Sequence, residues 1–180
     1  MTAVPTPNKM TAEEYFRKTE TMQERTELLD GQIVAMGSPS RTHQRIAYGI
    51  HRSIDDFIRA NGGSCEVNEA LDAHLDEYNV PVPDVMVVCD PSKLDEQGCH
   101  GAPDWVVEVL SKNRSDDLHR KLELYQNAGV REYWIVDPKN EKTLVYFFER
   151  NDLPDIYTFD TPIPVEIYDR KLEIRVADLV

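Results

Sequence analysis

Two carboxylates interrupt strongly apolar stretches of the sequence. Asp84 follows Val82-Pro83, ahead of a run of Val and Met, and Glu108 lies inside the segment Val106-Val107-Glu108-Val109-Leu110. A carboxylate in a buried strand is costly unless a positive charge or a metal ion compensates it. Carboxylates on successive strands could converge on a hard cation that takes oxygen ligands, which would be Mg²⁺ or Mn²⁺. The alternative is a charge at an exposed strand end or a single structural salt bridge.

Lys121 and His43 are the further candidates for chemistry. Lys121 lies between Leu118 and Tyr125 at helical spacing, beside the stripe that faces the sheet. Near a metal-bound phosphate its ammonium would stabilise negative charge or help to activate water, whereas an isolated lysine here would reach past the stripe to solvent. His43 is in phase with Ile46 and therefore points toward the sheet. A lone histidine on an apolar face is more often a structural residue than a catalyst.

Hydrophobic periodicity and turn signals predict the elements that position these side chains. Thr11 and Glu14 form a capping-box pattern for a first helix, and an Asp-Gly turn between apolar segments predicts a hairpin. The later elements are a helix over 42–60, extended segments over 64–75, 82–89 and 105–110, a helix over 115–128, a strand over 132–137, and antiparallel strands at a sheet edge. This order predicts an α+β, or mixed α/β, fold with helices packed on the faces of a sheet.

The length and charge of the chain limit the function classes. The 180 residues are 41% hydrophobic, which predicts one globular domain over residues 1–180. The net charge of −13 argues against adhesion to nucleic acid or anionic lipid through bulk charge. A divalent cation could still supply local positive charge. An enzyme acting on DNA would also need local basic side chains near its site, for which the candidates are Arg41, Arg45, Lys112, Arg114, Arg120 and Lys121.

The cysteines and the N-terminus indicate the cellular setting. Cys65, Cys89 and Cys99 are odd in number and lack C-x-x-C spacing, so neither a disulfide framework nor a cysteine zinc site is expected. We expect reduced thiols and a cytoplasmic location. No secretory apolar region opens the chain and no later run is long enough to span a membrane. Motifs typical of serine hydrolases, P-loop proteins and dinucleotide-binding proteins are also missing.

Several segments carry a specific resemblance. LLDGQIVAMGSPSRTHQRIA, VPVPDVMVVCD and the long stretch from Gly101 to Pro138 resemble the bacterial family of putative restriction endonucleases within the PD-(D/E)xK nuclease superfamily. The resemblance extends from about Thr11 to Val180. It implies a restriction-endonuclease-like core of helix, three strands, helix and strand, and a metal-dependent endonuclease that acts on DNA. Asp84 would then be the PD aspartate, and Glu108 would open the (D/E)xK half.

One position departs from the motif. Leu110 stands two residues after Glu108, where the motif has lysine. Some superfamily members place this lysine on the following helix, which makes Lys121 the candidate. The resemblance then implies that Asp84, Glu108 and the carbonyl of Val109 bind Mg²⁺ or Mn²⁺. Lys121 would orient or activate water and neutralise developing charge, and His43 would contact the phosphate or the surroundings of the metal.

Two other functions compete with the nuclease. The acidic charge and the missing strand lysine favour an inactive module that keeps the nuclease fold and acts as a subunit or binding partner. Two carboxylates would also suffice for a glycoside hydrolase, although no aromatic-rich segment flanks them. A nuclease that cuts both strands of DNA often needs two active sites, so we expect a homodimer.

Overall fold

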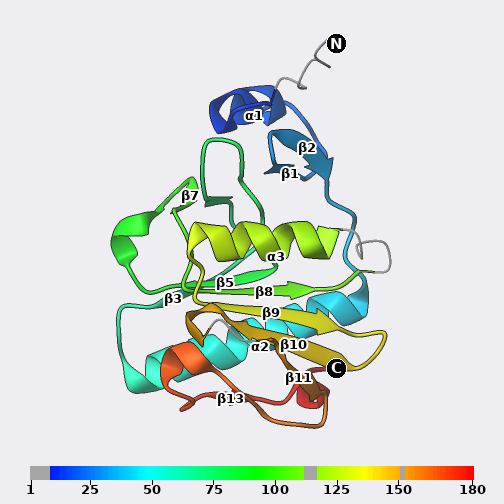
Figure 1. Cartoon of the computed structure of the whole chain (residues 1–180), viewed down its shortest axis with the longest axis vertical. Helices are drawn as coiled ribbons and strands as arrows, with labels where there is room; N and C mark the ends of the chain where they lie inside the picture. The colour runs from blue at the N-terminus through cyan, green and yellow to red at the C-terminus, as the bar shows by residue number, and fades with distance from the viewer. Residues whose placement is uncertain (1–8, 112–116, 151–152) are drawn as a thin grey trace.

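A six-stranded sheet forms the centre of the protein, with one helix against each face (Figure 1). The computed structural model describes residues 9–111, 117–150 and 153–180, apart from the side chains of 117–119. The strands are β3 (Glu66–Glu69), β5 (Val85–Val88), β8 (Trp105–Val109), β9 (Glu132–Asp137), β10 (Lys142–Phe147) and β11 (Asp155–Thr158). Their order in the sheet is β11-β10-β9-β8-β5-β3. Strands β8 and β9 are parallel, and the other neighbouring pairs are antiparallel.

The helices α2 (Arg41–Asn61) and α3 (Asp117–Ala128) cover opposite faces of this sheet (Figure 1). Side chains alternate along β8, so Val107 and Val109 join the core on the α2 side, whereas Val106 joins the core on the α3 side. Burial on both faces explains why β5 and β8 read as near-continuous apolar runs. Glu108 follows the same alternation and faces α3.

Shorter elements surround this core. The N-terminal layer contains α1 (Ala12–Thr19), the hairpin of β1 (Thr26–Leu29) and β2 (Gln32–Ala35), and the small sheet of β4 (Ala73–His74), β6 (Leu94–Asp95) and β7 (Gly98–His100). The C-terminal part contains the pair β12 (Ile163–Pro164) and β13 (Glu173–Ile174). In the part of the chain that the structure describes, 3-10 helices span Pro91–Lys93, Phe148–Arg150, Glu166–Tyr168 and Val176–Leu179.

The N-terminal hairpin is held against the chain that leads into β5. Its turn residues Asp30 and Gly31 have φ values of 51° and 74°, as the tight Asp-Gly turn requires. A Cβ atom at Gly31 would lie 2.6 Å from the Cβ of Lys9, so only glycine fits. Leu28 and Val80 exchange backbone hydrogen bonds of 3.1 and 2.8 Å. These bonds fix β1 beside the start of the Asp84 segment.

The structure confirms the predicted fold class and most of the predicted elements. The first helix has its capping box between Thr11 and Glu14, and both long helices and the central strands occur where periodicity placed them. The prediction of one continuous extended segment over 64–75 is wrong, because this stretch forms two strands, β3 and β4, in different sheets. Ala70 has a φ of 51° between them, so the chain turns there. Residues 112–116, which include the predicted start of the second helix, lie outside the described residues.

The expectation of three reduced cysteines is also wrong. Cys65 and Cys89 form a disulfide, and Cys99 is a buried free thiol. Pairing of β3 with β5 puts Glu66 opposite Val88, so the cysteines just beyond these two residues meet. The spacing of these two cysteines in the sequence does not indicate that they meet in the fold. Within the described residues, no helix has the length and apolar character needed to cross a membrane.

The disulfide predicts the outcome of a thiol titration. We expect the denatured but unreduced protein to expose one reactive thiol, that of Cys99, and the reduced protein to expose three. Reduction is expected to lower the free energy of unfolding by about 3 kcal/mol, because it releases a closed loop with a sequence separation of 24. A Cys99→Ser variant, as a control, should show no thiol before reduction. Three reactive thiols in the unreduced wild type would contradict the pairing.

Candidate functional site

Asp84 and Glu108 lie near each other at one end of the sheet, and the negative charge of Asp84 raises the pKa of Glu108. The antiparallel register pairs Val85 with Val107, and Asp84 and Glu108 are the next residues beyond this last pair. Asp84 Oδ2 also accepts a 2.8 Å hydrogen bond from the backbone N–H of Val109. The two carboxylates therefore lie together where β8 ends.

His43 joins this end of the sheet from α2. Its Nε2 lies 3.1 Å from Asp84 Oδ2, and both side chains are largely buried. The helix begins after Ser40, whose hydroxyl accepts a hydrogen bond from the backbone N–H of His43. This cap places His43 in the first turn of α2, on the buried face that the periodicity predicted.

Lys121 reaches the same carboxylates from α3. Its Nζ lies 2.9 Å from Glu108 Oε1 and 2.9 Å from Glu27 Oε2, and only 3% of the residue is exposed. Tyr125, one helical turn later, donates a 2.9 Å hydrogen bond to the same Glu108 oxygen. The ammonium group of Lys121 therefore points into the site and not to solvent.

Glu27 and Tyr125 were missed as site residues at the sequence level. Glu27 is fully buried in β1, and its Oε2 also accepts a hydrogen bond from the backbone N–H of Val82 at 3.3 Å. The sequence feature that could have pointed to Glu27 is a carboxylate next to Leu28-Leu29, in a strand that is buried throughout. Only the packing of the hairpin on the β5 segment brings this carboxylate to Lys121.

Burial and the nearby charged groups shift the pKa values of Glu108 and Lys121. Burial raises the pKa of Glu108 to about 7; the charge of Lys121 opposes this shift, and the carboxylates of Asp84 and Glu27 add to it. Burial alone would lower the pKa of Lys121, but Glu108 and Glu27 reverse that effect and raise it. Lys121 therefore stays protonated at neutral pH. Two carboxylates contact the one ammonium, and the carboxylate of Asp84 lies close enough to Glu108 to raise its pKa, so acidic groups outnumber the lysine in the site.

The oxygen donors fit a hard divalent cation. Hydrogen bonds and ion pairs within the described residues use Asp84 Oδ2 and Glu108 Oε1, and none reaches Asp84 Oδ1 or Glu108 Oε2. Each carboxylate thus keeps one oxygen that could bind an ion, and the carbonyl of Val109 would add a third donor. Among the residues that the structure describes, no three His, Cys, Asp or Glu side chains are grouped as a metal site. A cation here would rest on two carboxylates and a backbone oxygen.

Few of the basic side chains predicted to assist the site remain available. Arg120 is bound to Asp30 at 2.7 Å and to the carbonyl of Leu29. Lys121 is enclosed by Glu108 and Glu27, as described above. Lys112 and Arg114 lie outside the described residues. Arg41 and Arg45 are exposed on α2.

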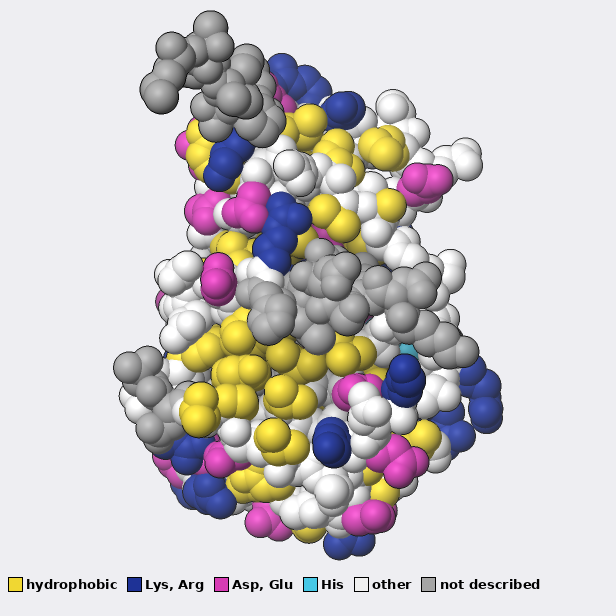
Figure 2. Space-filling model, turned by 45° about the vertical axis from the view of Figure 1, so that its right-hand side comes forward, with side chains coloured by type: hydrophobic (Ala, Val, Ile, Leu, Met, Phe, Trp, Pro, Cys, Tyr) yellow, Lys and Arg dark blue, Asp and Glu magenta, His cyan; other side chains and the backbone are white. Residues whose placement is uncertain are grey.

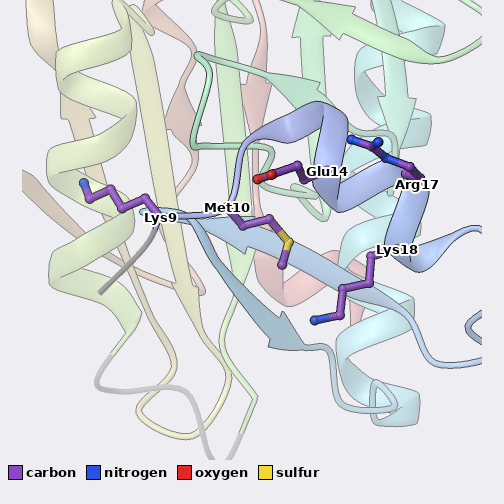
Figure 3. Close-up of a pocket in the computed structure, with 5 residues that line it drawn as sticks. All are labelled: Lys9, Met10, Glu14, Arg17 and Lys18. Carbon is purple, nitrogen blue, oxygen red and sulfur yellow. The ribbon is translucent and has the colours of Figure 1, made fainter. Parts of the chain in front are cut away.

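A surface depression on α1 is not part of this site. It has a volume of about 450 Å³ and is lined by Lys9, Met10, Glu14, Arg17 and Lys18 (Figure 3). The ammonium groups of Lys9 and Lys18 lie well apart in this view, and Glu14 already accepts the capping hydrogen bond of Thr11. None of its lining residues comes from α2, β5, β8 or α3. The buried carboxylate cluster remains the candidate site.

Known proteins are similar to this chain in sequence and in fold. The Uma2 family model, described as "Putative restriction endonuclease", matches residues 12–176. The Synechocystis protein slr1290 is 32% identical over 148 residues, which cover 80% of this chain and 76% of that protein. A second Synechocystis protein, sll1609, is 25% identical over 141 residues, covering 76% of this chain and 80% of that one.

A solved structure shows the same fold. It is a crystal structure of a putative nuclease of the DUF820 family from Anabaena variabilis, and it is 22% identical to this chain. The TM-score is 0.79, and the match covers 94% of this chain and 97% of the other. Because the Uma2 family model matches nearly the whole chain, this protein belongs to the Uma2 family of putative restriction endonucleases.

Proposed function

We propose that the protein is a metal-dependent endonuclease that hydrolyses phosphodiester bonds in DNA. Family membership and the solved relative support a nuclease in general terms. The single observation that favours an active enzyme is the position of Lys121, whose Nζ lies 2.9 Å from Glu108 Oε1. In this proposal, Lys121 on α3 takes the place of the motif lysine that the strand lacks at Leu110.

Each site residue has a distinct role in this proposal. Asp84, Glu108 and the carbonyl of Val109 would hold Mg²⁺ or Mn²⁺. When bound, such an ion polarises a phosphate oxygen and lowers the pKa of bound water. Lys121 keeps its proton because its carboxylate neighbours raise its pKa, so it acts as a hydrogen-bond donor and a positive charge toward the reacting phosphate, not as a base. His43 orients Asp84 or contacts the phosphate.

Glu27 and Tyr125 are positioning residues. Glu27 contacts the Lys121 ammonium together with Glu108, and the Tyr125 hydroxyl donates to the Glu108 oxygen that Lys121 also contacts. Burial raises the pKa of Tyr125 well above its ordinary range, so its hydroxyl remains a donor. We also propose a homodimer, which would bring two such sites to the two strands of a duplex. A cytoplasmic location is a further part of the proposal.

The test is cleavage of plasmid DNA with Mg²⁺ or Mn²⁺. Wild-type protein should nick or linearise the plasmid, whereas Glu108→Gln should not, because the amide keeps the shape of the side chain and removes the charge that binds metal. Glu132→Gln is a matched control. Glu132 is as buried as Glu108, but it contacts Trp134 and the backbone of Ile167 instead of the site. We expect this control to cleave at the wild-type rate under conditions in which it is folded.

Two results would contradict the proposal. A folded wild type that is inert on DNA and on RNA with either metal would favour the inactive subunit or binding partner. Cleavage by Glu108→Gln at the wild-type rate would place the activity elsewhere in the protein or in a contaminant.

A further inference from the structure

The outward face of α2 carries four residues that the proposed chemistry does not use. Arg41, Arg45, Tyr48 and Arg52 follow one another at spacings of four, three and four, which places them on one side of the helix. All four are exposed, and Tyr48 keeps 60% of its surface accessible. The opposite side of α2 carries the buried His43 and the isoleucines of the core. We call these four residues the α2 arginine face.

This face is basic in an acidic protein. Residues 41–54 contain three arginines and neither Asp nor Glu, although the chain holds 33 acidic residues. No ion pair or hydrogen bond joins the Arg41 or Arg45 side chain to another described residue. Arg52 lies 3.6 Å from Asp56, and about two-thirds of each side chain is exposed, so this pair is weak. Two uncompensated guanidinium groups and a weakly paired third therefore stand in a row.

Farther along the same helix the pattern changes. Arg59 lies on the same side of α2, but its Nε donates a 2.7 Å hydrogen bond to Asp55. The positive charge of the helix is thus concentrated in its first three turns. These turns begin where His43 contacts Asp84, at the end of the sheet that holds the candidate site. In Figure 1 the N-terminal ends of α2 and α3 and the tip of β8 lie on the same side of the molecule.

We propose that the α2 arginine face binds the sugar-phosphate backbone of duplex DNA beside the cleavage site. This inference rests on the proposed nuclease function and names the surface that would hold its substrate. From Arg41 to Arg52 the face is about 16 Å long, which covers several phosphates of one strand. Arginine and tyrosine side chains are typical donors to phosphate oxygens. Overall basic charge is not needed for this, because residues 41–54 form a local run with three arginines and no acidic residue. Figure 2 shows Lys and Arg side chains interspersed with Asp and Glu on one face of the molecule.

A duplex is favoured by the shape of the surface. The face is the exposed side of a helix and not a groove that could enclose an unpaired strand. Its arginines form a row along one side of α2, which can follow the backbone of one strand of a duplex. Contacts of this kind position the duplex without reading its sequence.

The test measures binding of a short fluorescent DNA duplex without divalent metal, so that cleavage does not interfere. We expect Arg41→Gln/Arg45→Gln to weaken binding and to reduce the slope of log K against log salt by about 1.8, because each phosphate contact contributes about 0.9. Tyr48→Phe, which loses only the hydroxyl, should weaken binding about fivefold. Arg59→Gln is the matched control from the same helix, and it should change neither the affinity nor the slope.

The outcomes separate this inference from the proposed function. If the double variant binds like the wild type while cleavage still depends on Glu108, the α2 arginine face is not the DNA surface and the nuclease proposal stands. Equal competition by single-stranded DNA, RNA or polyglutamate of matched charge would overturn the preference for a duplex. A wild type that neither binds nor cleaves DNA would overturn both proposals.

Discussion

Replacement of Lys121 by methionine is expected to lower the free energy of unfolding by about 3–5 kcal/mol, because it leaves two buried carboxylates without their cation. Glu27 and Glu108 are 0% and 4% exposed, and both contact the Lys121 ammonium at 2.9 Å. Methionine keeps most of the apolar stem, so the loss should reflect charge more than volume. Urea denaturation near neutral pH measures the effect.

A second substitution tests this explanation. Glu27→Gln in the Lys121→Met background removes the charge of one of the two buried carboxylates that Lys121 contacts, so the double variant should be more stable than Lys121→Met alone. The two changes should therefore be strongly non-additive, as expected for residues in direct contact. If their losses simply add, Lys121 is not the group that compensates Glu27. The catalytic role of Lys121 must accordingly be measured where the variant remains folded.

The stability of the protein should also fall as the pH rises through the titration of Glu132. Burial raises the pKa of this carboxyl from 4.5 to about 7, despite hydrogen bonds from the Ile167 backbone and the Trp134 indole. Because the folded state binds the proton more tightly, the stabilising contribution is complete below pH 4.5 and is lost as the pH passes 7. The expected loss is about 3 kcal/mol.

Glu132→Gln isolates this contribution from those of other titrating groups. The variant cannot ionise at this position, so the wild type should lose stability relative to it as the pH rises from about 5 to about 8. Urea denaturation of both proteins across this range measures the difference. A constant difference in unfolding free energy would mean that Glu132 does not titrate in this window in the folded protein.

Local patterns in the sequence determined most of the elements and the buried faces of the long helices. The Asp-Gly turn, the capping box of α1 and the helical spacing of α2 act through neighbouring residues, so they are visible without a structure. The same reasoning placed His43 on the buried face of its helix and Lys121 beside the apolar stripe of the next helix, because the helical period relates them to apolar neighbours. Asp84 and Glu108 stood out because charge is rare in buried strands.

Only the tertiary structure decided which of these side chains meet. The pairing of β5 with β8 brings Asp84 near Glu108, and the contact between Leu28 and Val80 brings Glu27 to Lys121. The disulfide and the break between β3 and β4 likewise depend on strand pairing. Each of these pairings joins residues far apart in the chain. Which strands pair, and in which register, depends on burial of the whole sheet, and a local sequence period does not contain that information.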